Sequence, residues 1–182
     1  MARVPYKSRE DLPTEKRELY DQIASQRGHV ARPFAALLNS PGVAASVAAM
    51  GEQLRYTSPT LPPEVREIAT LTTSRQLECQ YVFTHHVASA RENGVRDEVI
   101  QVIQEGTPPR RLLPKEGVFV QFTRELLDEH HVRDATYAAV EHLLGTQGTT
   151  DLVAMIGYYA LMCYATIALG VELEEGVTPL LG

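Results

Sequence analysis

The chain has 182 residues, of which 44% are hydrophobic and 22% are charged. A chain of this length and composition buries a core of its own, which excludes a disordered chain, a fibrous repeat and a coiled-coil rod. Its 17 Lys and Arg residues are outnumbered by 23 Asp and Glu residues, so the formal net charge is −6. Nucleic-acid-binding proteins usually carry a basic patch, and no nucleic-acid partner is expected here. Two cysteines do not make a disulfide framework, and a reducing, cytoplasmic compartment is expected.

Strand signals are nearly absent, and helical signals take their place from the N-terminus onward. The first helix is predicted from Thr14 to about Arg27, and Gly28 ends it. The dipeptide Ser40-Pro41 begins a second helix, as a cap followed by proline at the first helical position. The residues expected on the apolar face of that helix are Val43, Val47, Met50 and Leu54.

The central part of the chain predicts three more helices. The first starts at Pro62-Pro63-Glu64, and its inward residues are expected to be Val65, Ile68, Ala69 and Thr72. After a break near Leu77, a helix runs from about Glu78 to Asn93 and is followed by Gly94, where a left-handed residue belongs. Asp97 to Glu105 is a short helix closed by Gly106.

The C-terminal part begins with a loop at residues 107–109, and Pro114 then starts a helix through Val118, Phe122 and Leu126. Asp134 caps a helix that ends at Gly145, and Thr149 or Thr150 caps a final apolar helix that ends at Gly170. Residues 152–171 are long enough for a membrane span. Their glycine, three tyrosines and cysteine favour a buried central helix instead, so no membrane partner is expected.

Residues 171–182 are expected to form an extended arm that packs on another surface, such as a neighbouring subunit. The whole chain, residues 1–182, therefore predicts one all-α domain of about eight or nine helices with no sheet.

The densest group of reactive side chains lies between residues 67 and 86. Cys79 and His86 are seven residues apart on one predicted helix and share a face, with Val82 between them. Cys79 stands in the first turn, where free N–H groups and the helix dipole favour a thiolate. Glu67 comes from the preceding helix, and it reaches this face if the two helices form an antiparallel hairpin.

Tyr81 and His85 are four residues apart on the adjacent face of the same helix. The neighbouring histidines, His85 and His86, point to different faces, so spacing alone does not put both in one site. Each reactive residue also has an ordinary interpretation. A single helical cysteine is usually an inert core residue, and a single glutamate is usually a solvated charge.

In context, the string E-(11 residues)-C-x-Y-x-x-x-x-H-x-x-x-A-x-x-x-G resembles the carboxymuconolactone decarboxylase and AhpD-like alkylhydroperoxidase superfamily. The resemblance covers about Val43 to Gly106, and the closing helix and tail are similar to those of longer members. It implies a small, all-α, AhpD-like helical domain that forms homo-oligomers, commonly trimers or hexamers. The positions that carry it are Glu67, Cys79, Tyr81, His86, Ala90 and Gly94.

One position departs from the peroxidase branch of this superfamily. That branch has the motif C-x-x-C, and its second cysteine would fall at position 82, where this chain has Val82. The dithiol cycle needs two sulfurs within reach, and Cys163 is predicted to lie on a distant helix. A one-cysteine peroxidase would need an outside thiol to resolve its sulfenic acid.

The resemblance therefore favours the decarboxylase branch, which acts on small carboxylated lactones without metal or organic cofactor. The implied partner is a small-molecule acid, with no cofactor. In this interpretation His86 is the acid/base and Glu67 orients it, while His85 and Tyr81 hold the carboxylate or the lactone oxygen. The first alternative is an AhpD-like thiol-dependent hydroperoxide reductase centred on Cys79. The second is a catalytically silent helical assembly or binding protein.

Two weaker clusters remain. His130 and His131, beside two acidic residues, hint at metal ligands, but only His142 follows, so a solvated helix end is the better interpretation and no metal site is predicted. Tyr158, Tyr159 and Tyr164 lie on the final helix, where packing is the ordinary role and a hydroxyl lining a pocket is the alternative.

Overall fold

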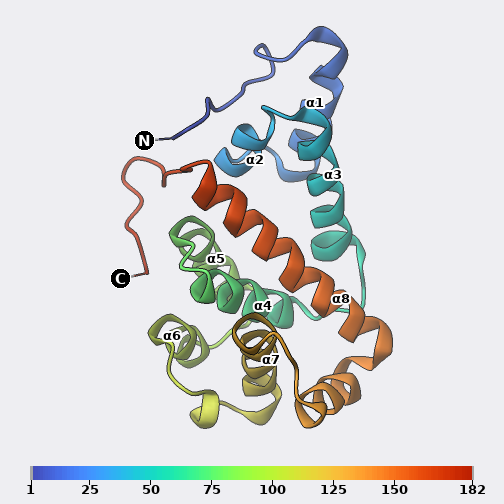
Figure 1. Cartoon of the computed structure of the whole chain (residues 1–182), viewed down its shortest axis with the longest axis vertical. Coiled ribbons are helices and arrows are strands. Elements are labelled where there is room, and N and C mark those ends of the chain that lie inside the picture. Colours follow the sequence, from blue (N-terminus) through green and yellow to red (C-terminus); the bar gives the residue numbers. More distant parts are fainter. Residues whose placement is uncertain (1, 182) are drawn as a thin grey trace.

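The computed structural model describes residues 2–181, apart from the side chains of residues 26 and 27. The described residues form eight α-helices and no strand, which confirms the all-α prediction (Figure 1). Short π-helical turns, Gln53–Thr57 and Glu125–Glu129, extend two of them. The helices are α1 (Arg17–Arg27), α2 (Arg32–Leu37), α3 (Pro41–Glu52), α4 (Pro63–Gln76), α5 (Gln80–Glu92), α6 (Asp97–Glu105), α7 (Pro114–Arg124) and α8 (Asp134–Ala168).

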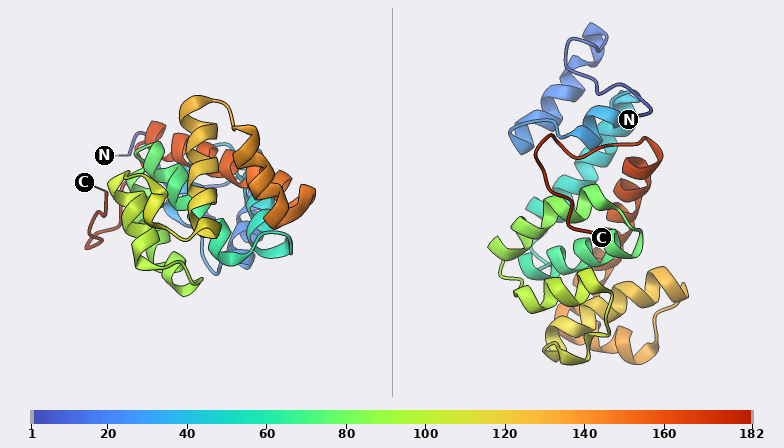
Figure 2. Two further views of the ribbon diagram at one scale, coloured as in Figure 1. Left: turned by 90° about the horizontal axis from the view of Figure 1, so that it is seen from below. Right: turned by 90° about the vertical axis from the view of Figure 1, so that its left-hand side faces the viewer.

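Helix α4 is the centre of the packing. It contacts α5, α6, α7 and α8, and all of its residues from Glu67 to Ser74 are buried. The predicted inward residues of this helix, from Val65 to Thr72, are all buried. Figures 1 and 2 show α1, α2 and α3 at one end of the molecule, α6 and α7 at the other, and α4, α5 and α8 between them.

The predicted apolar face of α3 was partly wrong. Val43 and Met50 are 52% and 42% exposed, while Val47 and Leu54 are buried as expected. The inward face is completed by the small residues Ala44, Ala48 and Gly51. Small side chains let α1 and α8 approach α3 closely, and a prediction that follows the large apolar residues misses such a face.

Helix α8 is two helical segments joined at Gly145, whose φ of 69° and ψ of 172° are not helical. The predicted break at this glycine is confirmed, but the second segment starts earlier than predicted. The hydroxyls of Thr149 and Thr150 donate to the carbonyls of Gly145 and Thr146, so they bond backward along the helix and cap nothing. The six-residue α2 was not predicted, because so short a helix shows no period.

Among the described residues, α8 is the one helix long and apolar enough to cross a membrane. It packs against α2, α3, α4, α5 and α7 of the same chain. The side chains of Leu152, Met155, Ile156 and Cys163 are almost completely buried. This packing agrees with the predicted central helix.

Residues 171–181 form the predicted non-helical arm, and Gly182 lies outside the described residues. The arm packs on its own chain. The backbone N–H of Leu180 donates to the Thr84 hydroxyl at 3.2 Å, and that of Leu181 donates to the Gln80 side chain at 3.1 Å. Both acceptors lie on α5, so the arm runs beside the helix that carries most of the reactive residues.

We propose that this chain assembles through α8. Its large hydrophobic side chains exposed on the single chain are Tyr137, Leu143, Val153, Leu161, Tyr164 and Ile167, each more than 40% exposed. Exposure of so many large apolar groups to water is unfavourable, and a subunit interface would cover them. Light scattering is expected to give a trimer or hexamer, and Leu161→Arg is expected to shift it to smaller species. Leu113→Arg, an equally exposed leucine outside α8, serves as the control, and a monomeric wild type at micromolar concentration would contradict the proposal.

Candidate active site

The turn between α4 and α5 places Cys79 at the N-terminus of α5. Glu78 adopts a left-handed φ of 53°, and the N–H of Cys79 donates to the carbonyl of Ser74 at 2.8 Å. Cys79 is thereby the N-cap residue of α5, one position before the predicted first turn. Interaction with Cys163 lowers the pKa of its thiol against the effect of burial, and the free backbone N–H groups of Val82 and Tyr81 at the start of α5 add to this lowering.

Glu67 on α4 and His86 on α5 form the central pair of the site. The Glu67 side chain is 2% exposed, and its Oε2 lies 2.8 Å from Nδ1 of His86. The predicted approach of these two residues from neighbouring helices is confirmed. The other carboxylate oxygen, Oε1, accepts from the Ser89 hydroxyl at 3.1 Å and from the guanidinium of Arg55 at 2.9 Å.

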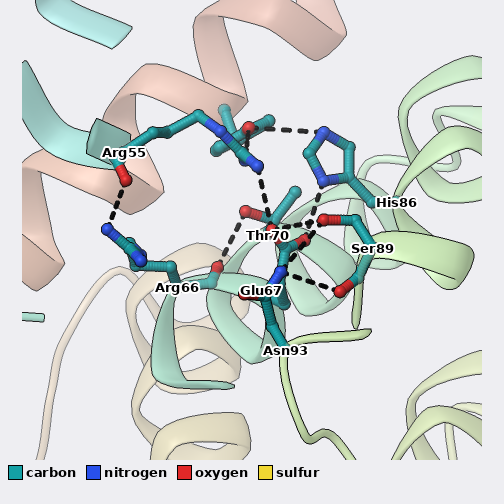
Figure 3. Close-up of polar contacts among 8 residues, drawn as sticks. Arg55, Arg66, Glu67, Thr70, His86, Ser89 and Asn93 are labelled. Carbon is teal, nitrogen blue, oxygen red and sulfur yellow. Dashed lines mark hydrogen bonds and ion pairs between the residues drawn. The ribbon is translucent and has the colours of Figure 1, made fainter. Parts of the chain in front are cut away.

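Figure 3 shows Arg55, His86 and Ser89 converging on Glu67. Arg55 comes from the π-helical turn after α3, and the guanidinium of Arg66 donates to its backbone carbonyl, which holds that turn against α4. Behind Ser89, the amide of Asn93 donates to its hydroxyl at 3.2 Å. Each partner of the carboxylate is itself held in place, so the charged centre is fixed.

The charges follow from these contacts. Burial opposes ionisation of Glu67, but hydrogen bonds and charge from His86, with Arg55 and Ser89, lower its pKa to about 2. Burial lowers the pKa of His86 despite the attraction of Glu67. At neutral pH Glu67 is therefore a carboxylate and His86 is neutral. An ionised carboxylate only accepts, so His86 carries its proton on Nδ1 and leaves a lone pair on Nε2.

Tyr159 on α8 lies at that lone pair. Its hydroxyl is 3.3 Å from Nε2 of His86 and accepts a hydrogen bond from Arg55. Burial raises the pKa of Tyr159, so the hydroxyl keeps its proton and donates it toward Nε2. The result is a chain of groups from Glu67 through His86 to Tyr159 that can move one proton.

A second cluster forms around Glu174, from the C-terminal arm. Its Oε1 accepts from the Tyr81 hydroxyl at 2.8 Å, and its Oε2 lies 2.7 Å from Nε2 of His85. The guanidinium of Arg32 lies 3.6 Å from the same carboxylate. Although partial burial disfavours the charged form, the contacts with Tyr81 and His85 lower the pKa of Glu174. Tyr81 and His85 thus lie side by side, with ring centres 4.4 Å apart, as their spacing predicted.

Both clusters line one cavity of about 690 Å³ between α2, α5 and α8. This volume suits a small organic molecule. The polar residues of its lining are His29, Arg32, Arg55, Tyr56, Tyr81, His85, His86, Ser89, Tyr158, Tyr159 and Glu174. Two arginines, three histidines and one carboxylate line it, and Arg55 is also paired with the buried carboxylate of Glu67. A smaller cavity of about 410 Å³ between α4 and α7 has no histidine, cysteine or tyrosine in its lining.

The cysteines differ from the prediction. Cys79 is 1% exposed and lies behind the cavity lining, which includes its neighbours Tyr81 and Val82. The expectation that Cys163 is distant was wrong, because the two side chains are near enough to shift each other's pKa, which is lowered for Cys79 and raised for Cys163. Sequence spacing shows neighbours within one helix, and it does not show which turn of α8 packs against the start of α5.

Sequence reasoning missed Arg32, Arg55, Ser89 and Glu174, and it offered Tyr159 only as an alternative. Ser89 lies three residues after His86 on α5, a spacing that could have found it. The others come from distant parts of the chain and carry no local signal. No three potential metal ligands gather anywhere in residues 2–181.

Residues 41–112 match the model of the carboxymuconolactone decarboxylase family. Among curated proteins no match is found. One similar solved structure is an uncharacterized peroxidase-related protein from Ralstonia eutropha JMP134, described as an alkylhydroperoxidase AhpD core. It is 20% identical with a TM-score of 0.79, and the match covers 98% of this chain and 97% of that chain.

Two further structures share the fold. An uncharacterized peroxidase-related protein from Silicibacter sp. TM1040 is 16% identical, with a TM-score of 0.75 over 96% of this chain and 91% of that chain. A debrominase in complex with 2,3,4-tribromopyrrole is 12% identical, with a TM-score of 0.74 over 94% and 91%. At these identities the likeness establishes the AhpD-like fold. Together with the family match, it confirms the predicted resemblance to this superfamily.

Proposed function

Because its sequence and its fold both match the carboxymuconolactone decarboxylase and AhpD-like superfamily, we propose that this chain is a cofactor-independent decarboxylase of a small carboxylated compound, such as a lactone. The supporting observation is the placement of His86. Its Nδ1 is bound to ionised Glu67, and its Nε2 meets Tyr159 at the wall of the cavity. Acid/base chemistry is what such a paired imidazole provides.

The contacts of Glu174 support a carboxylate-bearing substrate. A carboxylate from the arm already occupies a position where Tyr81, His85 and Arg32 receive it. A substrate carboxylate of the same shape and charge would use the same donors once the arm withdraws. These ion pairs stabilise the carboxylate itself, and they would slow its loss as CO2. This end of the cavity is therefore assigned to a second carboxylate of the substrate, which is anchored and not lost, and the carboxylate that leaves as CO2 is placed toward His86.

Decarboxylation of the anion consumes one proton. The C–C bond breaks, CO2 leaves, the electron pair delocalises onto the neighbouring carbonyl as an enolate, and a proton is then added to carbon. An anion bound beside Nε2 favours protonation of His86, and Glu67 stabilises the imidazolium. His86 then gives this proton to the carbon. Arg55 and the Tyr159 hydroxyl are placed to stabilise the developing oxyanion.

The mechanism sets the sign of the pH dependence. The pKa of His86 in the free protein is lowered below its usual value, by burial first. The imidazolium is the active form, so kcat/KM is expected to fall about tenfold per pH unit above that pKa. Loss of activity on acidification through this range would instead assign His86 as a base. The measurement is initial rate at low substrate concentration between pH 5 and 8, a window in which Glu67 stays ionised.

The arm provides a prediction about binding. If Glu174 competes with the substrate carboxylate, Glu174→Gln removes the competing charge and is expected to lower KM by roughly tenfold, or about 1.4 kcal/mol. Glu175→Gln, the exposed neighbour on the same arm, is the matched control and is expected to leave KM unchanged. A raised KM in Glu174→Gln would show that this carboxylate binds the substrate.

The proposal is tested with a set of small lactones that carry two, one or no carboxylates. Turnover is expected for carboxylated members and absent for the others. The alternative of thiol-dependent hydroperoxide reduction is favoured by one observation, the position of Cys79 at the N-terminus of α5, where the pKa of its thiol is lowered by Cys163 and by free backbone N–H groups. Robust hydroperoxide turnover with no CO2 release from any lactone would replace the proposal with this alternative. If neither CO2 release nor hydroperoxide turnover is observed, the remaining alternative is a catalytically silent assembly protein.

A further inference from the structure

The C-terminal arm, residues 171–181, has two parts that are held in different ways. Residues 171–173, which we call the base, are tied to the N-terminal part of the chain. The guanidinium of Arg32 donates to the backbone carbonyls of Glu172 and Leu173 at 3.0 and 2.7 Å. Because two main-chain groups are bound to one side chain, the base stays beside the start of α2 even if the rest of the arm moves.

The remaining residues of the arm, 174–181, which we call the flap, run beside α5 to the C-terminus (Figure 2). Glu174 and Val177 line the cavity. Beyond them, the N–H groups of Leu180 and Leu181 donate to two side chains of α5 at 3.2 and 3.1 Å. None of residues 174–181 is buried, and a segment with so few buried contacts opens at a much smaller cost than unfolding of the chain.

The charged contact of the flap with the cavity is made by Glu174. Its carboxylate accepts from the Tyr81 hydroxyl at 2.8 Å and lies 2.7 Å from Nε2 of His85 and 3.6 Å from the guanidinium of Arg32. If the flap left an empty cavity, these three groups would lose their common acceptor, which costs free energy. An anion bound between them would replace the acceptor and remove this cost. Opening of the flap is therefore coupled to the binding of an anion.

We propose that the flap is a built-in competitor of the substrate, which closes the cavity of the empty protein through Glu174 and opens when a small carboxylate takes the place of that side chain. The base remains on Arg32 throughout, so the flap closes again when the ligand leaves. A neutral molecule supplies no comparable acceptor and leaves the flap closed. This regulation rests on the proposed function only in taking a small carboxylate as the occupant of the cavity.

The experiment is hydrogen–deuterium exchange of the whole protein, read by mass spectrometry, with glutarate as the probe carboxylate. Glutaramide, its neutral diamide, is the control ligand, and sodium chloride equalises the ionic strength because salt alone weakens exposed ion pairs. Glutarate is expected to speed exchange in the flap, residues 174–181. Exchange in residues 3–8, whose N–H groups at Arg3 and Lys7 bond to other parts of the chain, is expected to stay unchanged. Glutaramide is expected to change neither segment.

The variant Glu174→Ala removes the internal carboxylate. Its flap is expected to exchange fast without glutarate and to show no further change when glutarate is added. A flap closed in about 90% of wild-type molecules raises the apparent Kd about tenfold, so the variant is expected to bind glutarate about tenfold more tightly in calorimetry. Glu175→Ala, at the next and exposed position of the flap, is the matched control and is expected to behave as wild type in both measurements.

Exchange of the flap that is unchanged or slower at high glutarate concentration overturns the proposal, because the arm would then be a fixed wall or a lid that closes over its ligand. An equal response to glutaramide also overturns it. So does a Glu174→Ala protein that binds glutarate no more tightly than wild type, or not at all. None of these measurements involves a lactone or CO2. Failure of the flap and failure of the decarboxylase are thereby separate results.

Discussion

His86→Ala is expected to reduce the catalysed rate of decarboxylation by about 10²- to 10⁴-fold, the usual contribution of a positioned acid/base. The variant lacks the only imidazole that joins Glu67 to the Tyr159 end of the cavity, so no group of similar pKa replaces it. The fold is expected to survive, because the side chain is partly exposed to the cavity. Steady-state kinetics at several pH values measure the rate, and far-UV circular dichroism checks the fold.

The variant Glu67→Gln separates positioning from charge. The amide still accepts a hydrogen bond from Nδ1 of His86, but it does not stabilise an imidazolium, so we expect a smaller loss than in His86→Ala. His85→Gln is the matched control on the neighbouring position of α5, and it is expected to change KM more than kcat because His85 contacts the anchoring end. An unchanged rate and pH profile in His86→Ala would make this histidine structural and direct attention to His85.

The second large effect concerns stability in acid. The pKa of Glu67 falls from 4.5 in the unfolded chain to about 2 in the folded protein. A lowered folded pKa contributes stability above the unfolded value, and this contribution is lost as the pH falls from about 4.5 toward 2. The difference corresponds to about 3 kcal/mol for this almost completely buried carboxylate, with a slope of about 1.4 kcal/mol per pH unit.

His86 acts in the same direction at a higher pH. Its folded pKa is lowered, so the unfolded chain takes up this proton first and acidification through about 6.5 already favours unfolding. Urea unfolding between pH 7 and 3 is expected to show the steeper loss in wild type than in Glu67→Gln. Glu64→Gln, an exposed carboxylate on the same helix, is expected to follow wild type. Parallel curves for wild type and Glu67→Gln would contradict the ionised, paired Glu67.

Local signals predicted much of the fold. Gly28, Gly94 and Gly106 end their helices as predicted, each with a φ between 69° and 88°. The position of such a helix end is predictable from the local sequence, because glycine adopts the left-handed backbone conformation after a helix far more readily than other residues do. In the site, the seven-residue spacing put Cys79 and His86 on one helix, and the motif brought in Glu67.

The rest depends on tertiary packing. Tyr159 meets Arg55 across 104 residues, and Glu174 meets Tyr81 across 93. The spacing of residues within one helix does not predict contacts between residues so far apart in the sequence. The same limit explains the error over Cys163, because its distance from Cys79 was judged from the sequence, and the packing of α8 on α5 decides it.

The central claim is that His86 delivers a proton to the carbon that loses CO2. It is tested most directly by turnover of a carboxyl-¹³C-labelled lactone in D₂O, with labelled CO2 followed by mass spectrometry and the product by NMR. Wild type is expected to release one labelled CO2 for each product and to place one deuterium on the carbon that lost it, and His86→Ala is expected to lose both signals together. Lactone consumed without labelled CO2, or deuterium incorporated equally by His86→Ala, would contradict the claim.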